Sequence, residues 1–582
     1  MKMKKLPIGV SDFKDMVTGN YYYVDKTLFI KEIIDRGDKI LLIPRPRRFG
    51  KTLNLSMLGY FYDCCPVAWD PDSNPKETRS RQSTSTDTYI YKHLFDSLAI
   101  SRAGQEYLDK MGQHPVIFLT FRLIKEKNWK ACLGKIKELI QDEYARHYYL
   151  LESRTLMPHE RKYFQKIIDL KGDEGNYENS LGKLLVFLSR FYNKRAVILI
   201  DEYDAPVHAG FNYGYYDDVI NFMRNFLSGG LKDTDQYLEK GVVTGIMRIA
   251  KESIFSGFNN PGVYTLLSPK FSDSFGFTEE EVKTMLTDFQ LLDMYDGVQL
   301  WYNGYLFGGK VIYNPWSIIN FMNSGEKKCR PYWVNTSDNE IVETLLTRQG
   351  TELEEELEQL IRGESIEKAI DENIILKAAL LREDLLWSFL LMGGYLKQTD
   401  ERRDAASGKI FYKLSIPNEE VKITYTGIID RYFSSKIENK KLEIMLKALI
   451  EGDVELFEEM LQKVVHAVCS YHDFGDEPEK VYHALVAGML TWITNTHDIK
   501  SNRESGYGRY DIMVIPHDPT RVGYVIEFKK TRKNETVESA IKSALQQIEA
   551  KQYETELRER GIKHIKKLAI AFSGKEVFVR EP

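Results

Sequence analysis

The chain has 582 residues, of which 43% are hydrophobic and 28% are charged. These fractions are typical of a folded globular protein and exclude a disordered, collagen-like or fibrous chain. The length corresponds to about three or four domains. The 80 basic and 85 acidic residues give a net charge of −5. This balance argues against a protein that binds nucleic acid over its whole surface.

The sequence also indicates the compartment of the protein, through its apolar segments and its cysteines. No stretch approaches the roughly 18 to 20 apolar residues that cross a bilayer, and the basic N-terminus leads into no apolar signal region. The five cysteines are scattered without metal-ligand spacing, as expected for reduced thiols. We therefore expect a cytoplasmic protein without a membrane partner.

The first half of the chain alternates between predicted strands and helices. Short apolar runs, typical of strands buried in a parallel sheet, lie at 39–43, 115–121, 196–200 and 241–246. Helical patterns lie at 28–34, 129–149 and 181–192. This alternation predicts a parallel α/β sheet. Residues 66–88 are polar and rich in Pro, Asp, Ser and Thr, which predicts an inserted loop.

The second half begins with helices and ends with a mixed pattern. Residues 385–421 are typical of a helix followed by a small hairpin, similar to a winged helix, and helices continue over 442–468. The last part predicts a helix at 480–493, strands at 510–515 and 523–529, a helix at 535–558, and strands at 567–572 and 576–580. We therefore expect three parts, at 1–278, 279–476 and 477–582.

The charge is unevenly distributed between these parts. Residues 500–582 contain 17 basic and 12 acidic residues, a net charge of +5, so the preceding 499 residues carry −10. A basic C-terminal part on an acidic body favours an anionic partner for that part, although solvated surface lysines produce such imbalances as well.

A candidate phosphate-binding loop follows the first predicted strand. The segment Arg45-Pro-Arg-Arg-Phe-Gly-Lys-Thr52 leads into a predicted helix, and the N-terminus of a helix binds phosphate through its free N–H groups. Gly50, Lys51 and Thr52 fit the end of the G-x-x-x-x-G-K-[ST] pattern, in which Lys reaches the phosphates and Ser/Thr binds Mg²⁺. Arg45 replaces the first glycine, so we expect the loop to turn on its prolines.

Polar residues follow two further predicted strands. Asp201 and Glu202 end the run at 196–200, at the carboxyl edge of the sheet where ligands bind. Asp201 is expected to hold Mg²⁺ and Glu202 to orient the attacking water. Thr244 and Arg248 end the next strand, where they are candidates to sense the γ-phosphate and to stabilise transition-state charge; capping or a salt bridge would explain them equally well.

A second candidate site lies near the C-terminus. Asp511 begins one predicted strand, while Glu527 and Lys529 share one face of the next. Two carboxylates can bind one or two Mg²⁺ ions, and Lys529 can position the attacking water. The alternative is a structural ion pair between Glu527 and Lys529.

The sequence also resembles a known family. The segments Leu6-Pro-Ile-Gly-Val-Ser-Asp-Phe13, Tyr22-Tyr-Val-Asp-Lys-Thr27 and Arg45-Pro-Arg-Arg-Phe-Gly-Lys-Thr52 are similar to the opening of bacterial AAA-ATPase-like proteins, as are Tyr302-Asn-Gly-Tyr305 and Asn314-Pro-Trp-Ser317. The resemblance implies a P-loop ATPase that uses ATP and Mg²⁺, with Arg48 and Phe49 in its nucleotide loop. It further implies a C-terminal nuclease of the PD-(D/E)XK superfamily.

The nuclease resemblance adds residues to the second site. Ala544-Leu-Gln-Gln-Ile548 resembles the Gln-containing helix that faces the active site in that superfamily, with Gln547 preferred over Gln546. The third acid would be Glu479 or Glu504. The resemblance is also compatible with a homo-oligomer.

Two functions remain open at this point. The first is an ATPase with a Mg²⁺-dependent nuclease that acts on nucleic acid, with DNA favoured over RNA. The alternative is a nucleotide-dependent regulatory switch whose nuclease-fold part binds nucleic acid without cutting it.

Overall fold

A computed structural model describes most of the chain. The described residues are 4–64, 91–248, 261–333, 356–372, 383–425, 439–468 and 486–582, with short gaps at 358, 362, 406–407, 487–488, 494, 502–503, 506–507, 532–534 and 574–575. The predicted inserted loop at 66–88 and most of the predicted helix at 480–493 lie outside them.

The chain forms two compact units. The N-terminal unit comprises Met1–Leu345 and Glu367–Val421, and the C-terminal unit comprises Leu346–Ile366 and Lys422–Pro582. These two units do not coincide with the three expected parts at 1–278, 279–476 and 477–582. The three parts remain a prediction about function.

The N-terminal unit is built around a five-stranded parallel sheet with the strand order β2-β3-β4-β1-β5. The four predicted strands are all present. The bounds are β1 (Ile40–Pro44), β2 (Val116–Thr120), β3 (Ala196–Asp201), β4 (Leu238–Gly245) and β5 (Gly262–Val263). In a parallel sheet of this kind, ligands bind beyond the carboxyl ends of the strands.

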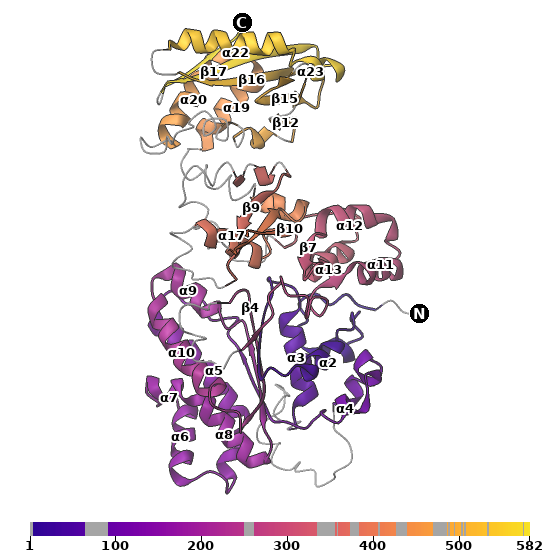
Figure 1. The fold of residues 1–582 in the computed structure, drawn as a ribbon, viewed down its shortest axis with the longest axis vertical. Helices are drawn as coiled ribbons and strands as arrows, with labels where there is room; N and C mark the ends of the chain where they lie inside the picture. Colours follow the sequence, from indigo (N-terminus) through magenta and orange to yellow (C-terminus); the bar gives the residue numbers. More distant parts are fainter. Residues whose placement is uncertain are drawn as a thin grey trace. The chain divides into compact units, whose positions relative to one another are not determined.

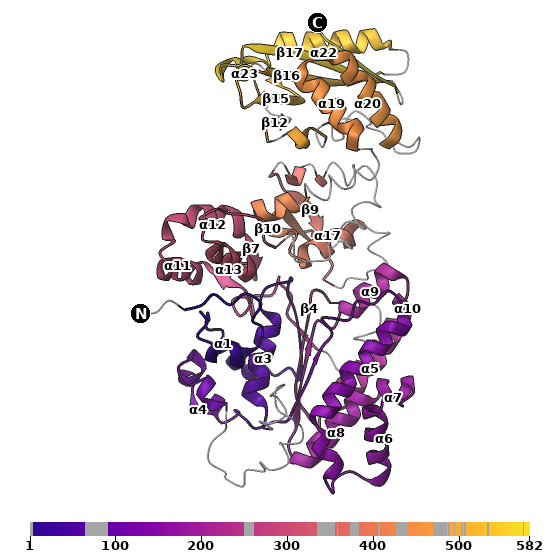
Figure 2. The ribbon, with the colours of Figure 1, turned by 180° about the vertical axis from the view of Figure 1, so that it is seen from behind.

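Helices cover both faces of this sheet, so the central strands are almost completely buried. Figure 1 shows α1 to α4 on one face and α5 to α10 on the other, and Figure 2 shows the same arrangement from behind. The first group is α1 (Phe13–Thr18), α2 (Leu28–Asp35), α3 (Lys51–Tyr62) and α4 (Gln105–Leu108). The second is α5 (Trp129–Arg146), α6 (Pro158–Ile168), α7 (Glu174–Glu178), α8 (Ser180–Tyr192), α9 (Ala205–Tyr213) and α10 (Tyr216–Leu231).

Two small α/β groups complete the N-terminal unit. One is the antiparallel sheet β6-β8-β7, which packs with three helices around its own apolar core; its elements are β6 (Phe277–Thr278), α11 (Glu279–Asp288), α12 (Tyr295–Tyr302), β7 (Tyr305–Phe307), β8 (Lys310–Tyr313) and α13 (Pro315–Ser324). The other contains the predicted helix and hairpin, with the sheet order β10-β11-β9; its elements are β9 (Ile366–Ala369), α17 (Glu383–Met392), β10 (Lys397–Arg403) and β11 (Ile410–Ser415).

A buried carboxylate joins these two groups. Glu420 follows β11 and has no exposed surface. It accepts hydrogen bonds from the backbone N–H groups of Tyr332 (2.6 Å) and Trp333 (2.8 Å) and from the hydroxyl of Ser317 in α13 (2.7 Å). Burial raises the pKa of Glu420 to about 7, because the charged form loses its hydration there.

The C-terminal unit contains a mixed five-stranded sheet with the order β12-β15-β16-β17-β18. Only β16 and β17 run parallel. The strands are β12 (His497–Ser501), β13 (Glu504–Ser505), β14 (Gly508–Arg509), β15 (Ile512–Pro516), β16 (Val522–Lys530), β17 (His564–Ser573) and β18 (Glu576–Arg580), where β13 and β14 form a separate hairpin. The helices are α19 (Asn439–Glu451), α20 (Val454–Val468), α22 (Val537–Lys551) and α23 (Thr555–Glu559).

The two faces of β16 belong to different cores. Ile526 and Phe528 pack with α19 and α20, whereas Val525 packs with α22 and α23. The predicted alternation of side chains along this strand is therefore confirmed. The helix predicted at 535–558 is divided into α22 and α23, because Gln552 adopts a left-handed conformation (φ 51°) that ends the first helix.

The edge strand β18 lies beside α20. Val577 N–H donates to Gln462 Oε1 (2.7 Å) and Val579 N–H donates to Glu458 Oε2 (3.1 Å). Glu458 also pairs with Arg580. Side chains of a helix thus accept hydrogen bonds from backbone groups at the edge of the sheet.

Candidate functional site

The predicted phosphate loop joins β1 to α3. Gly50 precedes the first residue of α3 and has a φ of 85°, which glycine adopts without the strain that a Cβ would introduce. The loop turns at Arg47 and Arg48, the latter with a φ of 69°, so the expectation of a turn on the prolines was wrong. The physical reason is that proline fixes φ near −65° and cannot supply the left-handed conformation.

Arg45 stands where the G-x-x-x-x-G-K-[ST] pattern has its first glycine, and its side chain has a structural role. Its guanidinium is completely buried and donates to the carbonyl oxygens of Pro44 (2.8 Å), Tyr264 (2.7 Å) and Phe271 (2.9 Å). It also lies against the rings of Phe275 and Phe307. Burial lowers the pKa of Arg45 to about 9. The side chain fixes the base of the loop to the segment that follows β5.

Lys51 lies at the centre of the loop. Its Nζ donates to the carbonyl oxygens of Arg45 (3.0 Å) and Pro46 (3.1 Å) and lies 3.4 Å from Glu202 Oε1. In the G-x-x-x-x-G-K-[ST] pattern the lysine at this position reaches the phosphates of the bound nucleotide.

Asp201, the last residue of β3, is hydrogen-bonded to side chains of α3 and β4. It is completely buried and accepts hydrogen bonds from the hydroxyls of Thr52 (2.7 Å) and Thr244 (2.8 Å). Burial, together with the negative charge of Glu202, raises the pKa of Asp201. A threonine hydroxyl beside a carboxylate is an oxygen donor set that suits Mg²⁺, so Thr52 and Asp201 fit the predicted metal site.

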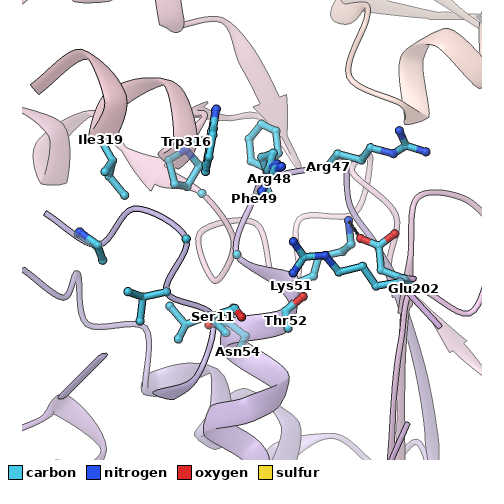
Figure 3. Close-up of a pocket in the computed structure, with 18 of the residues that line it drawn as sticks. Ser11, Arg47, Arg48, Phe49, Lys51, Thr52, Asn54, Glu202, Trp316 and Ile319 are labelled. Atoms are coloured by element: carbon cyan, nitrogen blue, oxygen red, sulfur yellow. Dashed lines mark ion pairs between the residues drawn. The ribbon is translucent and has the colours of Figure 1, made fainter. Parts of the chain in front are cut away.

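A cavity of about 500 Å³ opens in front of this loop, within the range of ligand-binding pockets. Figure 3 shows Lys51, Thr52 and Glu202 on one side of it and Trp316 and Ile319 on the other. The guanidinium of Arg48 lies 4.3 Å from the centre of the Trp316 ring. Six cationic residues line the cavity: Lys26, Arg47, Arg48, Lys51, Arg122 and Lys125. Glu202 is the carboxylate among the described lining residues, so the cavity is suited to an anion.

Two predicted residues, Thr244 and Arg248, do not line the cavity. Thr244 contacts Asp201 rather than the open cavity. Phe49 does line the cavity, although its side chain is only 1% exposed and packs against Tyr305 and Phe307. The packing of the Phe49 ring therefore anchors the loop to β7.

The second site lies where β15 and β16 begin to pair. Ile512 pairs with Ile526, so Asp511 and Glu527 come next in the antiparallel register. Asp511 Oδ2 accepts a hydrogen bond from the N–H of Phe528 (2.8 Å), and Lys529 Nζ lies 3.2 Å from Glu527 Oε1. The pairing of two neighbouring strands therefore brings Asp511 close to Glu527 and Lys529.

Glu527 is buried in an unusual electrostatic environment. Its side chain is 1% exposed, and its Oε2 atom has no hydrogen-bond partner among the described residues. Burial and the charge of Asp511 raise the pKa of Glu527 to about 7. A buried carboxylate oxygen without a donor is costly, and a divalent cation would satisfy it. The residues present therefore fit Mg²⁺ at Asp511 and Glu527.

The neighbouring helix contributes to this site. Gln547 Nε2 donates to the hydroxyl of Tyr553 (3.3 Å), and that phenol lies within the electrostatic influence of Glu527, Asp511 and Lys529. Burial raises the pKa of Tyr553. Within the described part of the chain, no three His, Cys, Asp or Glu side chains gather in a metal-binding cluster. Of the two candidates for a third acid, Glu479 lies outside the described residues, and Glu504 is described only as part of β13.

Two family profiles match the regions of the chain that contain these sites. The profile of the AAA-ATPase-like family, described as a predicted AAA-ATPase, matches residues 7–67 and 85–255. The profile of a PD-(D/E)XK nuclease superfamily matches residues 477–581. The chain combines an AAA-ATPase-like domain with a PD-(D/E)XK nuclease-superfamily domain. The resemblance inferred from the sequence motifs is therefore confirmed, as is the mixed α/β fold class.

A relative from Azotobacter chroococcum mcd 1 is similar to the whole chain. It is named "Uncharacterized protein in vnfD 5'region" and is 25% identical over 584 residues, which cover 98% of this chain and 97% of the relative. No solved structure matches the chain. None of the helices in the described residues is both long and apolar enough to span a membrane.

Sequence reasoning missed several residues of the AAA-ATPase-like site. Arg122 and Lys125 follow β2 at the same sheet edge as Asp201, and Trp316 begins α13. Arg122 had a detectable signal, because it directly follows the strand predicted at 115–121, which ends at the ligand-binding edge. Trp316 lies in the segment Asn314-Pro-Trp-Ser317 that carries the family resemblance, but only the tertiary fold brings α13 to the loop.

Proposed function

We propose that the protein binds and hydrolyses ATP at the phosphate loop and cleaves nucleic acid at the Asp511–Glu527–Lys529 site, with Mg²⁺ at both. DNA is the favoured substrate of the second site. The observation that carries the proposal is the burial of Glu527, whose unpartnered Oε2 atom lies beside a second carboxylate and a lysine. The cationic cavity at the AAA-ATPase-like loop supports the nucleotide half.

At the ATP site, the protein's own residues have separate roles. The first N–H groups of α3 and the Lys51 ammonium would bind the phosphates. Thr52 and Asp201 would hold Mg²⁺, which supplies charge neutralisation at the transferred phosphoryl group when it is bound. When Lys51 turns toward the phosphates, its ion pair with Glu202 is broken. The Glu202 carboxylate is then free to accept a proton from the attacking water.

At the nuclease site, Asp511 and Glu527 would hold Mg²⁺, which supplies a polarised water and stabilises charge on the scissile phosphate when it is bound. Lys529 lies on the same face of β16 as Glu527 and would orient the attacking water. Gln547 and Tyr553 would hold the substrate side of the site through their hydrogen bond.

Several broader properties belong to the same proposal. We place the functional boundaries at 1–278, 279–476 and 477–582, and we propose a cytoplasmic protein that forms a homo-oligomer. Light scattering of the purified chain, with and without ATP, tests the oligomer. Residues 500–582 carry a net charge of +5, whereas the rest of the chain carries −10. Because a basic region attracts polyanions, this distribution supports nucleic acid as the partner of the C-terminal part.

The decisive experiment incubates the full chain with plasmid DNA and an equivalent RNA, with Mg²⁺ or EDTA and with or without ATP. Glu527→Ala should abolish cleavage, whereas Glu538→Ala, an exposed site on α22, should not. Lys51→Ala should abolish ATP hydrolysis, with Lys130→Ala on the exposed face of α5 as its control. Absence of cleavage by the unaltered protein under every condition would overturn the nuclease half.

One observation favours the alternative of a nucleotide-dependent switch. The indole N–H of Trp333 donates to the carbonyl of Arg47 (3.4 Å), and a Cβ at Gly394 would come within 2.9 Å of Pro46 Cβ. The winged-helix-like group thus touches the phosphate loop. Nucleotide binding that changes the oligomeric state, without hydrolysis or cleavage, would support this alternative.

A further inference from the structure

The turn that follows β2 lies beside the predicted magnesium site. Thr120, the last residue of β2, pairs in register with Asp201. The N–H of Phe121 donates to the carbonyl of Asp201 (3.0 Å), and the Thr120 hydroxyl lies 3.4 Å from Asp201 Oδ2. The chain therefore leaves the sheet directly next to Asp201.

This turn displays two residues on a rigid base. The N–H of Ile124 donates to the carbonyl of Phe121 (3.0 Å), and both side chains are buried. Between them, Arg122 and Leu123 are exposed, Leu123 at 86%. Arg122 lines the cavity together with Thr52 and Glu202. A guanidinium is thus held at the cavity by a short segment anchored at both ends.

Arg122 differs from three other cations of the cavity in having no partner among the described residues. Lys26 is paired with Glu281 (2.7 Å), Lys51 is bound to loop carbonyls, and Arg48 is stacked on Trp316. Among the described residues, Arg122 makes neither a hydrogen bond nor an ion pair. It also lies close enough to Arg48 to help lower the pKa of that guanidinium, after the larger effect of burial. Two like charges facing one cavity are favourable when an anion lies between them.

The sheet order indicates which part of an anion Arg122 meets. The phosphate loop follows β1, whereas Glu202 follows β3, which is separated from β1 by β4. Arg122 follows β2, which pairs with β3 on the side away from β4 and β1. Phosphates held at the N-terminus of α3 would extend toward Glu202. The terminal phosphate is the end of a triphosphate that lies farthest from the nucleoside, so it is the group that would reach the side of the cavity with Glu202 and Arg122.

We propose that Arg122 binds the terminal phosphate of a nucleoside triphosphate and makes the cavity distinguish triphosphate from diphosphate. This inference rests on the proposed ATP site. A charged hydrogen bond from a guanidinium to phosphate is strong and directional. ADP lacks the group that Arg122 would contact.

The test measures affinity rather than turnover. Calorimetric titration of the full chain with ADP and with a non-hydrolysable ATP analogue, both with Mg²⁺, compares the unaltered protein with Arg122→Ala and Arg122→Lys. Loss of a charged hydrogen bond predicts a tenfold to roughly hundredfold weaker affinity for the analogue in Arg122→Ala. We expect less than a twofold change for ADP and an intermediate effect for Arg122→Lys. Arg102→Ala, an exposed arginine outside the cavity, is the control.

Each outcome gives a clear result. Equal weakening of ADP and the analogue, or no weakening of either, would overturn the role of Arg122 while leaving the ATP site intact. If the unaltered protein binds neither nucleotide, the ATP site and the role of Arg122 both fail. Because Arg122 is exposed and makes no hydrogen bond or ion pair with the described residues, its variants should keep the circular dichroism spectrum of the unaltered protein.

Discussion

The buried Glu420 carboxylate allows a quantitative prediction about stability. It accepts three hydrogen bonds, from Tyr332, Trp333 and Ser317, and its pKa is raised to about 7 from an ordinary value of 4.5. We replace it with glutamine, which has nearly the same shape and stays neutral at every pH. The substitution therefore isolates the effect of the charge.

The sign follows from proton binding in the two states. Between pH 4.5 and 7 the folded protein holds a proton on Glu420 that the unfolded chain has lost, so the contribution of Glu420 to stability falls as pH rises. With these two pKa values, the loss between pH 5 and pH 8 is roughly 2.5 kcal/mol. Glu420→Gln removes this slope, and the variant should gain about that much relative to the unaltered protein over the same interval.

The assay is urea denaturation of the full chain at pH 5, 6, 7 and 8, with the unfolding of the N-terminal unit followed separately from that of the C-terminal unit. Comparing the variant with the unaltered protein at each pH cancels the contributions of other titrating groups. Glu401→Gln, an exposed site on β10, is the control. A difference between variant and unaltered protein that stays constant from pH 5 to pH 8 would refute the reasoning.

Three further substitutions test the sites. Arg45→Gly restores the standard loop motif but removes the donors to three carbonyl groups, so we expect a loss of stability on the order of 3 kcal/mol and weaker nucleotide binding; tighter binding with unchanged stability would contradict this role. Glu527→Gln should abolish cleavage yet stabilise the metal-free protein by roughly 1 kcal/mol at pH 8, because it removes repulsion from Asp511; thermal melting in EDTA measures the gain, and a lower melting temperature would count against it. Asp201→Asn should abolish Mg²⁺-dependent ATP hydrolysis while nucleotide binding in EDTA changes by no more than a few-fold, and unchanged hydrolysis would exclude Asp201 as a metal ligand.

Much of the fold was predictable because it depends on local patterns. Continuous apolar runs mark strands buried on both faces, and their carboxyl ends bring Thr52 and Asp201 to one edge of the sheet. In the same way, the period of two along β16 separates Val525 from Ile526 without knowledge of the helices that cover each face. These features follow from chain geometry alone.

Other features depend on contacts between distant segments and could not be predicted. The sequence presents Arg45 as a defect in a motif, whereas the fold surrounds it with carbonyl groups from residues 264 and 271. Glu420 looks like any surface acid, yet it is the shared acceptor of three donors from two other segments. A buried polar group is explained only by its partners, and its partners are set by tertiary structure.

The contact between α20 and β18 has a consequence for self-association. Four residues of a helix advance about 6 Å and two residues of a strand about 6.6 Å, so Glu458 and Gln462 repeat at nearly the interval of Val579 and Val577. An open strand edge is a template on which another chain can add a strand. Here two of the backbone donors of that edge are already satisfied by the helix. Addition of a strand from another copy at β18 would therefore have to displace the α20 side chains that occupy these two donors, which disfavours β18 as a surface for self-association.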